Sequence, residues 1–177
     1  MRLLRFVFLC FIFHSCSQPR ENKIQVKTYF DLKSYFEKEA DHLNKLNLKI
    51  TKYVSVNDKI EHKAVKIADF HKELSSFIDA DINKAAWQSE FKVTREKHVT
   101  TYVSENEKIP VKKLEVRYQN NKVTSIFMVI KVDNILYHST DSLTYKSNQY
   151  YEIKKTQQIK LLKEKKYTIK GKLNSRN

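Results

Sequence analysis

The chain has 177 residues but only one glycine, Gly171, which lies close to its end. Phosphate-binding loops, the dinucleotide-binding fingerprint and the Gly-x-Ser-x-Gly turn of many hydrolases each need more than one glycine. They need them because the backbone turns tightly or approaches the ligand closely. The sequence therefore excludes all three motifs and the large enzyme classes that depend on them.

Cysteine is equally scarce, since Cys10 and Cys16 are the two in the chain and none follows them. The chain beyond residue 16 therefore cannot form disulfides, thiolate zinc sites or iron–sulfur clusters, and it has no cysteine nucleophile. Its histidines show neither a His-Glu-x-x-His pattern nor another metal-ligand spacing. They are His42, His62, His71, His98 and His138. We expect no metal site and no cofactor.

Long hydrophobic runs are missing beyond the first sixteen residues, where no stretch reaches the about 18 consecutive apolar residues of a membrane-spanning helix. The remaining chain is long enough for one hydrophobic core without covalent cross-links. Positive charge, in contrast, is abundant, with a net charge of +14. We expect a single domain at residues 28–173.

The first sixteen residues, MRLLRFVFLCFIFHSC, have a pattern of their own. Arg2 and Arg5 form a basic head, and an apolar core of roughly ten residues follows, as in secretory signal peptides. This core is too short to cross a membrane as a helix, which takes about 20 residues. Ser15 precedes Cys16, and residues 17–22 are polar. The pattern predicts export from the cytoplasm.

Ser15 and Cys16 at the end of the apolar core resemble the lipobox of bacterial lipoproteins, in which the cysteine is acylated and the signal is removed before it. Phe13 and His14 depart from the usual leucine and small residue. Such loose boxes with Phe-rich cores are similar to those of Bacteroidota lipoproteins. The resemblance implies a signal peptide at residues 1–15 and lipid on Cys16. The alternatives are a soluble secreted protein with an incidental cysteine and a buried N-terminal helix.

Residues 16–27 are polar, include Pro19 and lack periodicity, which indicates a tether between the lipid anchor and the domain. In lipoprotein families, acidic residues directly after the acylated cysteine can direct export to the cell surface. This tether is neutral to basic. The resemblance therefore implies an outer-membrane lipoprotein that faces the periplasm and does not meet nucleic acid.

Helical periodicity is confined to the first half of the domain. Leu32, Phe36 and Leu43 recur at helical spacing and predict a helix from Thr28 or Asp31 to about residue 47. Asp69 can cap a second helix over residues 70–80.

Alternating or apolar segments separated by turn residues predict strands along the rest of the chain. They are residues 48–56, 59–66, 91–95, 98–104, 109–118, 122–131, 135–145, 149–162 and 167–173. Residues 122–131 are apolar on both faces, so we expect a central strand that is covered on both sides. The fold class that follows is α+β, a curved antiparallel meander sheet packed on two N-terminal helices.

The least regular segment holds the single tryptophan, Trp87, together with Asp79 and Asp81. One hypothesis is a ligand cleft in which these three residues take part. The alternative is structural, with the tryptophan wedged between helix and sheet and the two carboxylates serving turns.

The C-terminal strands carry the strongest charge signal, since residues 146–172 hold nine lysines and two glutamates. One hypothesis is an anion-binding face for anionic lipid or another envelope protein. Its candidate residues are Lys154, Lys155, Lys160, Lys163, Lys165 and Lys166. The alternative is a solvated surface that guards the edge of the sheet, because lysines on edge strands block aggregation.

The function that we favour from the sequence is non-catalytic. It is a lipid-anchored envelope protein that binds a partner or a small apolar ligand on its sheet. At the level of architecture only, helices laid in a curved antiparallel sheet resemble lipoprotein carriers and cone-shaped ligand-binding folds. The rival is a small periplasmic hydrolase with its site near Trp87, which would show a deep pocket with convergent polar groups.

Overall fold

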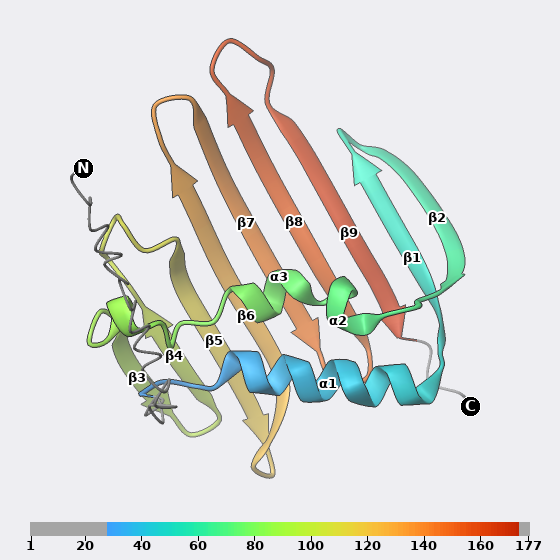
Figure 1. Ribbon diagram of the computed structural model, residues 1–177, viewed down its shortest axis with the longest axis horizontal. Coiled ribbons are helices and arrows are strands. Elements are labelled where there is room, and N and C mark those ends of the chain that lie inside the picture. The colour runs from blue at the N-terminus through green and yellow to red at the C-terminus, as the bar shows by residue number, and fades with distance from the viewer. Residues whose placement is uncertain (1–27, 174–177) are drawn as a thin grey trace, which may run out of the picture.

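The computed structural model describes residues 28–173, so the expected signal peptide, Cys16 and the tether lie outside the described residues. Within that range the chain forms one open antiparallel sheet in the order β2-β1-β9-β8-β7-β6-β5-β4-β3 (Figure 1). The strands are β1 (Lys49–Val56), β2 (Lys59–Lys66), β3 (Lys92–Glu96), β4 (Val99–Val103), β5 (Val111–Gln119), β6 (Lys122–Asp133), β7 (Tyr137–Lys146), β8 (Tyr150–Ile159) and β9 (Lys165–Leu173).

The strands from β3 to β9 form the expected meander, in which each strand pairs with the next one along the chain. The early β1–β2 hairpin is added at the far side, where β1 pairs with β9. The edges of the sheet are therefore β2 and β3. The lysine-rich strands β8 and β9 lie inside the sheet, so the interpretation of their lysines as edge protection is wrong.

Three turns of this sheet lie at one end, which we call the hairpin end (the upper end in Figure 1). It comprises residues 57–58 between β1 and β2, 134–136 between β6 and β7, and 160–164 between β8 and β9. The backbone joins the first and third turns, because Asn57 N–H donates to Lys166 O at 2.9 Å. A second bond joins the second and third turns, from Lys160 N–H to Leu136 O at 2.9 Å.

The first helix, α1 (Leu32–Leu46), confirms the prediction from periodicity. Asp31 caps it by accepting a hydrogen bond from Ser34 N–H at 3.0 Å. The helix ends at Asn47, whose φ of 50° is the left-handed conformation that asparagine tolerates. Its buried stripe, made of Leu32, Phe36, Ala40 and Leu43, faces the sheet.

The second predicted helix is divided in two at Leu74, into α2 (Phe70–Glu73) and α3 (Ser75–Asp79). Asp69 caps α2 as expected, by accepting from His71 N–H at 2.9 Å. A 3₁₀ turn, η1 (Ala85–Trp87), follows α3. The expectation of two N-terminal helices is thus not confirmed, because one long helix is joined by two short ones that come after the first hairpin.

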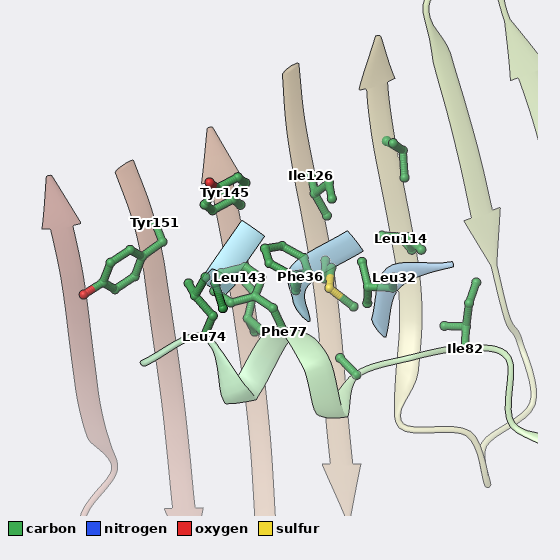
Figure 2. Packing of buried hydrophobic residues seen from close by; sticks show 14 of the residues in the cluster. Leu32, Phe36, Leu74, Phe77, Ile82, Leu114, Ile126, Leu143, Tyr145 and Tyr151 are labelled. Carbon is green, nitrogen blue, oxygen red and sulfur yellow. The ribbon is translucent and has the colours of Figure 1, made fainter. Parts of the chain in front are cut away.

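The helices cover one face of the sheet and form a single core with it (Figure 2). Phe36 of α1 lies between Phe77 of α3 and Tyr145 of β7, with ring centroids 4.8 Å and 5.2 Å away. Ile126 and Met128 of β6 are fully buried beneath them. The apolar area removed from water here, at about 25 cal/mol per Å², is the main source of stability.

The opposite face of the sheet has no second layer within residues 28–173. Phe127 and Val129 alternate with Ile126 and Met128 along β6, and both are only half-buried. The expectation that β6 is covered on both sides is therefore wrong. Phe127 is shielded by its neighbours in the sheet instead, with Glu115 and Thr144 directly opposite it.

The single glycine of the chain has a packing role. Gly171 of β9 lies directly opposite Tyr151 of β8, and the fully buried Tyr151 ring lies over the glycine backbone. A Cβ atom on residue 171 would overlap the ring atoms of Tyr151. Any larger residue would force this tyrosine out of the core.

Gly171→Ala should lower the free energy of unfolding by about 1–3 kcal/mol, as overpacking of a core does. Denaturant unfolding would measure the change. Lys172→Ala, on the next residue of β9 and on the opposite face, is the matched control and should have little effect. Equal stability of the glycine variant and the control would contradict the proposed packing role.

Candidate functional site

The helices cross only part of their face of the sheet, and the part next to the hairpin end stays open (Figure 1). A groove of about 370 Å³ lies there, between α3 and the strands. This volume lies within the range of small-molecule sites. The lining residues come from α3, β6, β7, β8 and β9, and they are Ser76, Ile130, Asp141, Leu143, Ile153, Lys155, Gln157, Tyr167 and Ile169.

The floor of the groove has an apolar row of side chains beside a row that carries a charged pair. Ile153 lies directly opposite both Leu143 and Ile169 in the sheet, so the three form a row across β7, β8 and β9. In the next row, Asp141 forms an ion pair with Lys155 at 3.2 Å. Asp141 also accepts a hydrogen bond from the buried Ser139 hydroxyl at 2.5 Å. The arrangement suits a ligand with an apolar body and a hydrogen-bonding end.

Two further hollows, of about 300 and 430 Å³, lie on β1 and β2, and Val54 lines both. Val54 lies opposite Ile169 of the groove floor. The open strip of sheet therefore continues from the groove towards the edge strand. The groove differs from these hollows because Ser76 of α3 gives it a wall.

The six lysines that the sequence suggested as one anion-binding face are spread over three surfaces. Lys155 and Lys165 are on the helix-side face, because they lie opposite Tyr167 and Gln157, which line the groove. Lys154 and Lys166 are on the other face. Lys160 and Lys163 lie in the turn between β8 and β9. The six do not form a common face, and whether any of them binds an anion stays a prediction.

On the face away from the helices, two glutamates each pair with two cations, so the face keeps a positive excess. Glu152 pairs with Lys154 at 3.1 Å and with Lys170 at 3.3 Å. Glu115 pairs with Lys113 at 3.1 Å and with Arg117 at 2.6 Å. Partial burial alone would raise the pKa of Glu115, but the hydrogen bonds and charges of these two cations outweigh it and lower the pKa. This face has the character of a solvated surface.

The segment around Trp87 shows structural contacts. Trp87 is half-buried and packs against the core, with Lys84 Nζ 4.3 Å from its ring centroid. Asp81 accepts a hydrogen bond from Asn83 Nδ2 at 3.2 Å, and the same amide nitrogen donates to Phe30 O at 2.9 Å. Asp79 is exposed at the end of α3. These contacts favour the structural alternative for the three residues.

Two partly buried polar clusters lie between the helices and the sheet. Tyr151 hydroxyl donates to Glu73 of α2, which also binds Lys52 Nζ of β1 at 2.7 Å. Tyr145 hydroxyl donates to Glu39 of α1 at 2.6 Å. In residues 28–173, no buried side-chain nitrogen or oxygen atom lacks a hydrogen-bond partner. Each cluster therefore satisfies its own polar groups and ties one helix to the sheet, α2 through Glu73 and α1 through Glu39.

Catalytic and metal-binding arrangements are not found in the part of the chain that the structure describes. His71 pairs with Asp41 at 2.8 Å and His138 with Asp133 at 2.6 Å, both at exposed positions, and no serine hydroxyl is bonded to either imidazole there. Residues 28–173 hold no group of three His, Cys, Asp or Glu side chains able to bind a metal. None of their helices combines the length and hydropathy needed to cross a membrane.

Comparisons of the chain with protein-family models, with curated proteins and with solved structures found no match. The groove itself was not predicted from the sequence, although Lys155 was named as a candidate for another reason. The available signal was the alternation of Ile153, Lys155 and Gln157 along β8, which puts one cation between an apolar and an amide side chain on a single face.

The buried tyrosines predict a loss of stability in alkali. Burial raises the pKa of Tyr35 to about 12, and it raises the pKa values of Tyr145 and Tyr151 further. Tyrosines in the unfolded chain ionise near pH 10, so the stabilisation is complete below about pH 10 and is lost as the pH rises through the folded-state values. Tyr35 alone should account for roughly 1–2 kcal/mol.

Denaturant unfolding between about pH 9 and pH 11.5 would measure this loss. Tyr35→Phe should show a shallower decline than the unchanged protein, and Tyr137→Phe, on the half-buried tyrosine of β7 near the hairpin end, is the matched control. An identical slope for Tyr35→Phe and the unchanged protein would contradict the assignment.

Proposed function

We propose that this protein is a lipid-anchored cell-envelope protein that faces the periplasm and binds a small apolar or amphipathic ligand in its groove. The observation that carries the ligand part is the groove itself, with its apolar floor and the Asp141–Lys155 pair. The lipid anchor rests on the resemblance of Ser15-Cys16 to a lipobox. The proposed role is non-catalytic.

The finer architecture of the proposal is a curved sheet on which α1 and the α2–α3 segment act together as two helices of one layer. They bury the part of the sheet that holds Tyr145 and Tyr151 and leave the hairpin end open. A ligand then lies along β7, β8 and β9, with its apolar body over Ile153 and Ile169. Its polar end can take a hydrogen bond from Lys155 or from the amide of Gln157.

The rival function, a small hydrolase with its site near Trp87, has less support. Asp81 and Trp87 have the structural contacts described above, and the groove contains no histidine. The Ser139 hydroxyl donates to Asp141 at the groove. Its partner is therefore a carboxylate and not the histidine that usually activates a serine nucleophile.

The anchoring part of the proposal predicts the fate of Cys16. The mature protein should be found in the membrane fraction with fatty acid attached, because two or more acyl chains hold a protein stably on a bilayer. Cys16→Ser should abolish incorporation of radiolabelled fatty acid, whereas Cys10→Ser should leave it unchanged. Absence of label from the unchanged protein would refute the anchor and leave the groove untested by this experiment.

The proposed ligand site predicts that substitutions on the two faces of β9 affect ligand binding differently. Ile169→Gln should weaken binding of a fluorescent fatty acid by about tenfold, since it removes roughly one buried aliphatic side chain from the contact. Thr168→Gln is the matched control, because residue 168 is equally half-buried but lies on the opposite face. Fluorescence titration of both variants, after thermal melts show that both are folded, would measure the difference.

Equal affinities of the two variants, or no binding by the unchanged protein, would overturn the groove as a ligand site. Displacement of the probe by a non-fluorescent fatty acid is the accompanying test of specificity.

A further inference from the structure

Large hydrophobic side chains are exposed mainly at the hairpin end. In the described part of the chain eleven are exposed, and nine of these lie in or beside the three turns of that end. Leu161 is 96% exposed, Ile135 85% and Leu136 64%. The nine are Val54, Val56, Ile60, Val132, Ile135, Leu136, Ile159, Leu161 and Leu162.

The two most apolar turns, 134–136 and 160–164, are held in shape by their own hydrogen bonds. Asn134 Oδ1 accepts from the backbone N–H groups of Leu136 and Tyr137, both at 3.0 Å. Gln158 Nε2 donates to Leu162 O at 2.7 Å. Because these backbone groups have partners inside the turns, moving the turns into a less polar medium leaves fewer of them unsatisfied.

Leu161 occupies a backbone conformation that does not suit it. Its φ is 69°, in the left-handed region where glycine or asparagine is usual. The side chain makes almost no contact with the domain, since it is nearly fully exposed. A leucine at this position therefore contributes little to the fold, and its selection points to a contact outside the chain.

Lysines surround these apolar tips. Lys160 and Lys163 lie in the β8–β9 turn, Lys165 and Lys166 begin β9, and Lys59 begins β2 beside them. The nearby carboxylates are Asp58, Asp133 and Glu164. Asp133 is paired with His138 at 2.6 Å, and Glu164 with Lys166 at 3.5 Å. The end as a whole carries a positive excess around protruding apolar residues.

We propose that the hairpin end docks on a phospholipid membrane that contains anionic lipids. Leu161, Leu162, Ile135 and Leu136 enter the boundary between headgroups and acyl chains, and the surrounding lysines contact lipid phosphates. Protruding apolar side chains with a basic rim match the two layers of such a surface in depth and in charge. This docking does not depend on acylation of Cys16, so it can be tested without the anchor.

The experiment uses the full chain with Cys10→Ser and Cys16→Ser, which contains no cysteine and cannot be acylated. A single new cysteine is labelled with an environment-sensitive fluorophore, either Ile135→Cys at the hairpin end or Gln149→Cys in the exposed turn at the opposite end of β7 and β8. The probes are vesicles of phosphatidylethanolamine with phosphatidylglycerol, and vesicles of phosphatidylcholine alone.

We expect the label at residue 135 to brighten and shift to the blue on the anionic vesicles, and the label at residue 149 not to change. Leu161→Gly combined with Leu162→Asn should remove the response. The glycine also relieves the positive φ, so this variant should melt no lower than its parent. Lys160, Lys163 and Lys165 changed together to Gln should weaken binding on the order of a hundredfold at low salt.

Three results would overturn the proposal. One is an equal response of the two labels, or none, on anionic vesicles. Another is an equal response of residue 135 to anionic and neutral vesicles, which would remove the role of the lysines. The third is a response that rises with protein concentration in the absence of vesicles, which would make a second copy of the chain the occupant. None of these results bears on fatty-acid binding in the groove or on acylation of Cys16.

Discussion

The width of the helical layer is the constraint on which the other features of this structure depend. A helix with its side chains is about 10 Å across, so α1 and the α2–α3 segment together cover roughly 20 Å of strand length. A ten-residue strand such as β8 spans about 33 Å. About a third of the sheet on this face therefore stays open, and its apolar residues form the groove and the approach to the hairpin end.

The position of the helices is fixed by contacts that alternate between apolar and polar. Phe36 packs between Phe77 and Tyr145, and the Tyr145 hydroxyl is bonded to Glu39 on the same helix as Phe36. The Tyr151 hydroxyl is bonded to Glu73 and in this way attaches α2 to the sheet. Tyr151 needs the bare backbone of Gly171 beneath it, so the attachment of α2 to the sheet depends on the one glycine of the chain.

Local features of the fold could be predicted from the sequence because their causes are local. The Asp31 cap, the buried stripe of α1 and the alternation of the strands each depend on residues a few positions apart. The division of the second helix at Leu74 could not be predicted, because Phe70, Leu74 and Phe77 also fit one continuous helix. Tertiary burial of Leu74 and capping of α2 at Asp69 decide its geometry.

The pairing of distant strands could not be predicted from the sequence, for a different reason. The placement of β1 beside β9 joins segments more than a hundred residues apart, and no periodicity encodes which edge of a meander an early hairpin will occupy. The charge signal of the C-terminal strands was real, but alternation sends Lys154 and Lys155 to opposite faces. The groove depends on both facts, since β9 supplies Tyr167 and Ile169 to it.

The groove and the hairpin end are parts of the same open strip, and this gives the two proposals a common geometry. Gln157 and Tyr167 line the groove on the side of the hairpin end, and Gln157 lies opposite Lys165, which begins β9 next to the β8–β9 turn. A membrane that receives Leu161 and Ile135 therefore lies against the open end of the groove.

The expected tether is long enough for this arrangement. Residues 17–27 reach at most about 40 Å when extended, which exceeds the roughly 33 Å length of a ten-residue strand such as β8. If Cys16 carries lipid as we propose, this length is compatible with lipid and hairpin end meeting one bilayer. An apolar ligand could then pass between that bilayer and the row of Leu143, Ile153 and Ile169 without crossing water, which is the step that its low solubility makes slow.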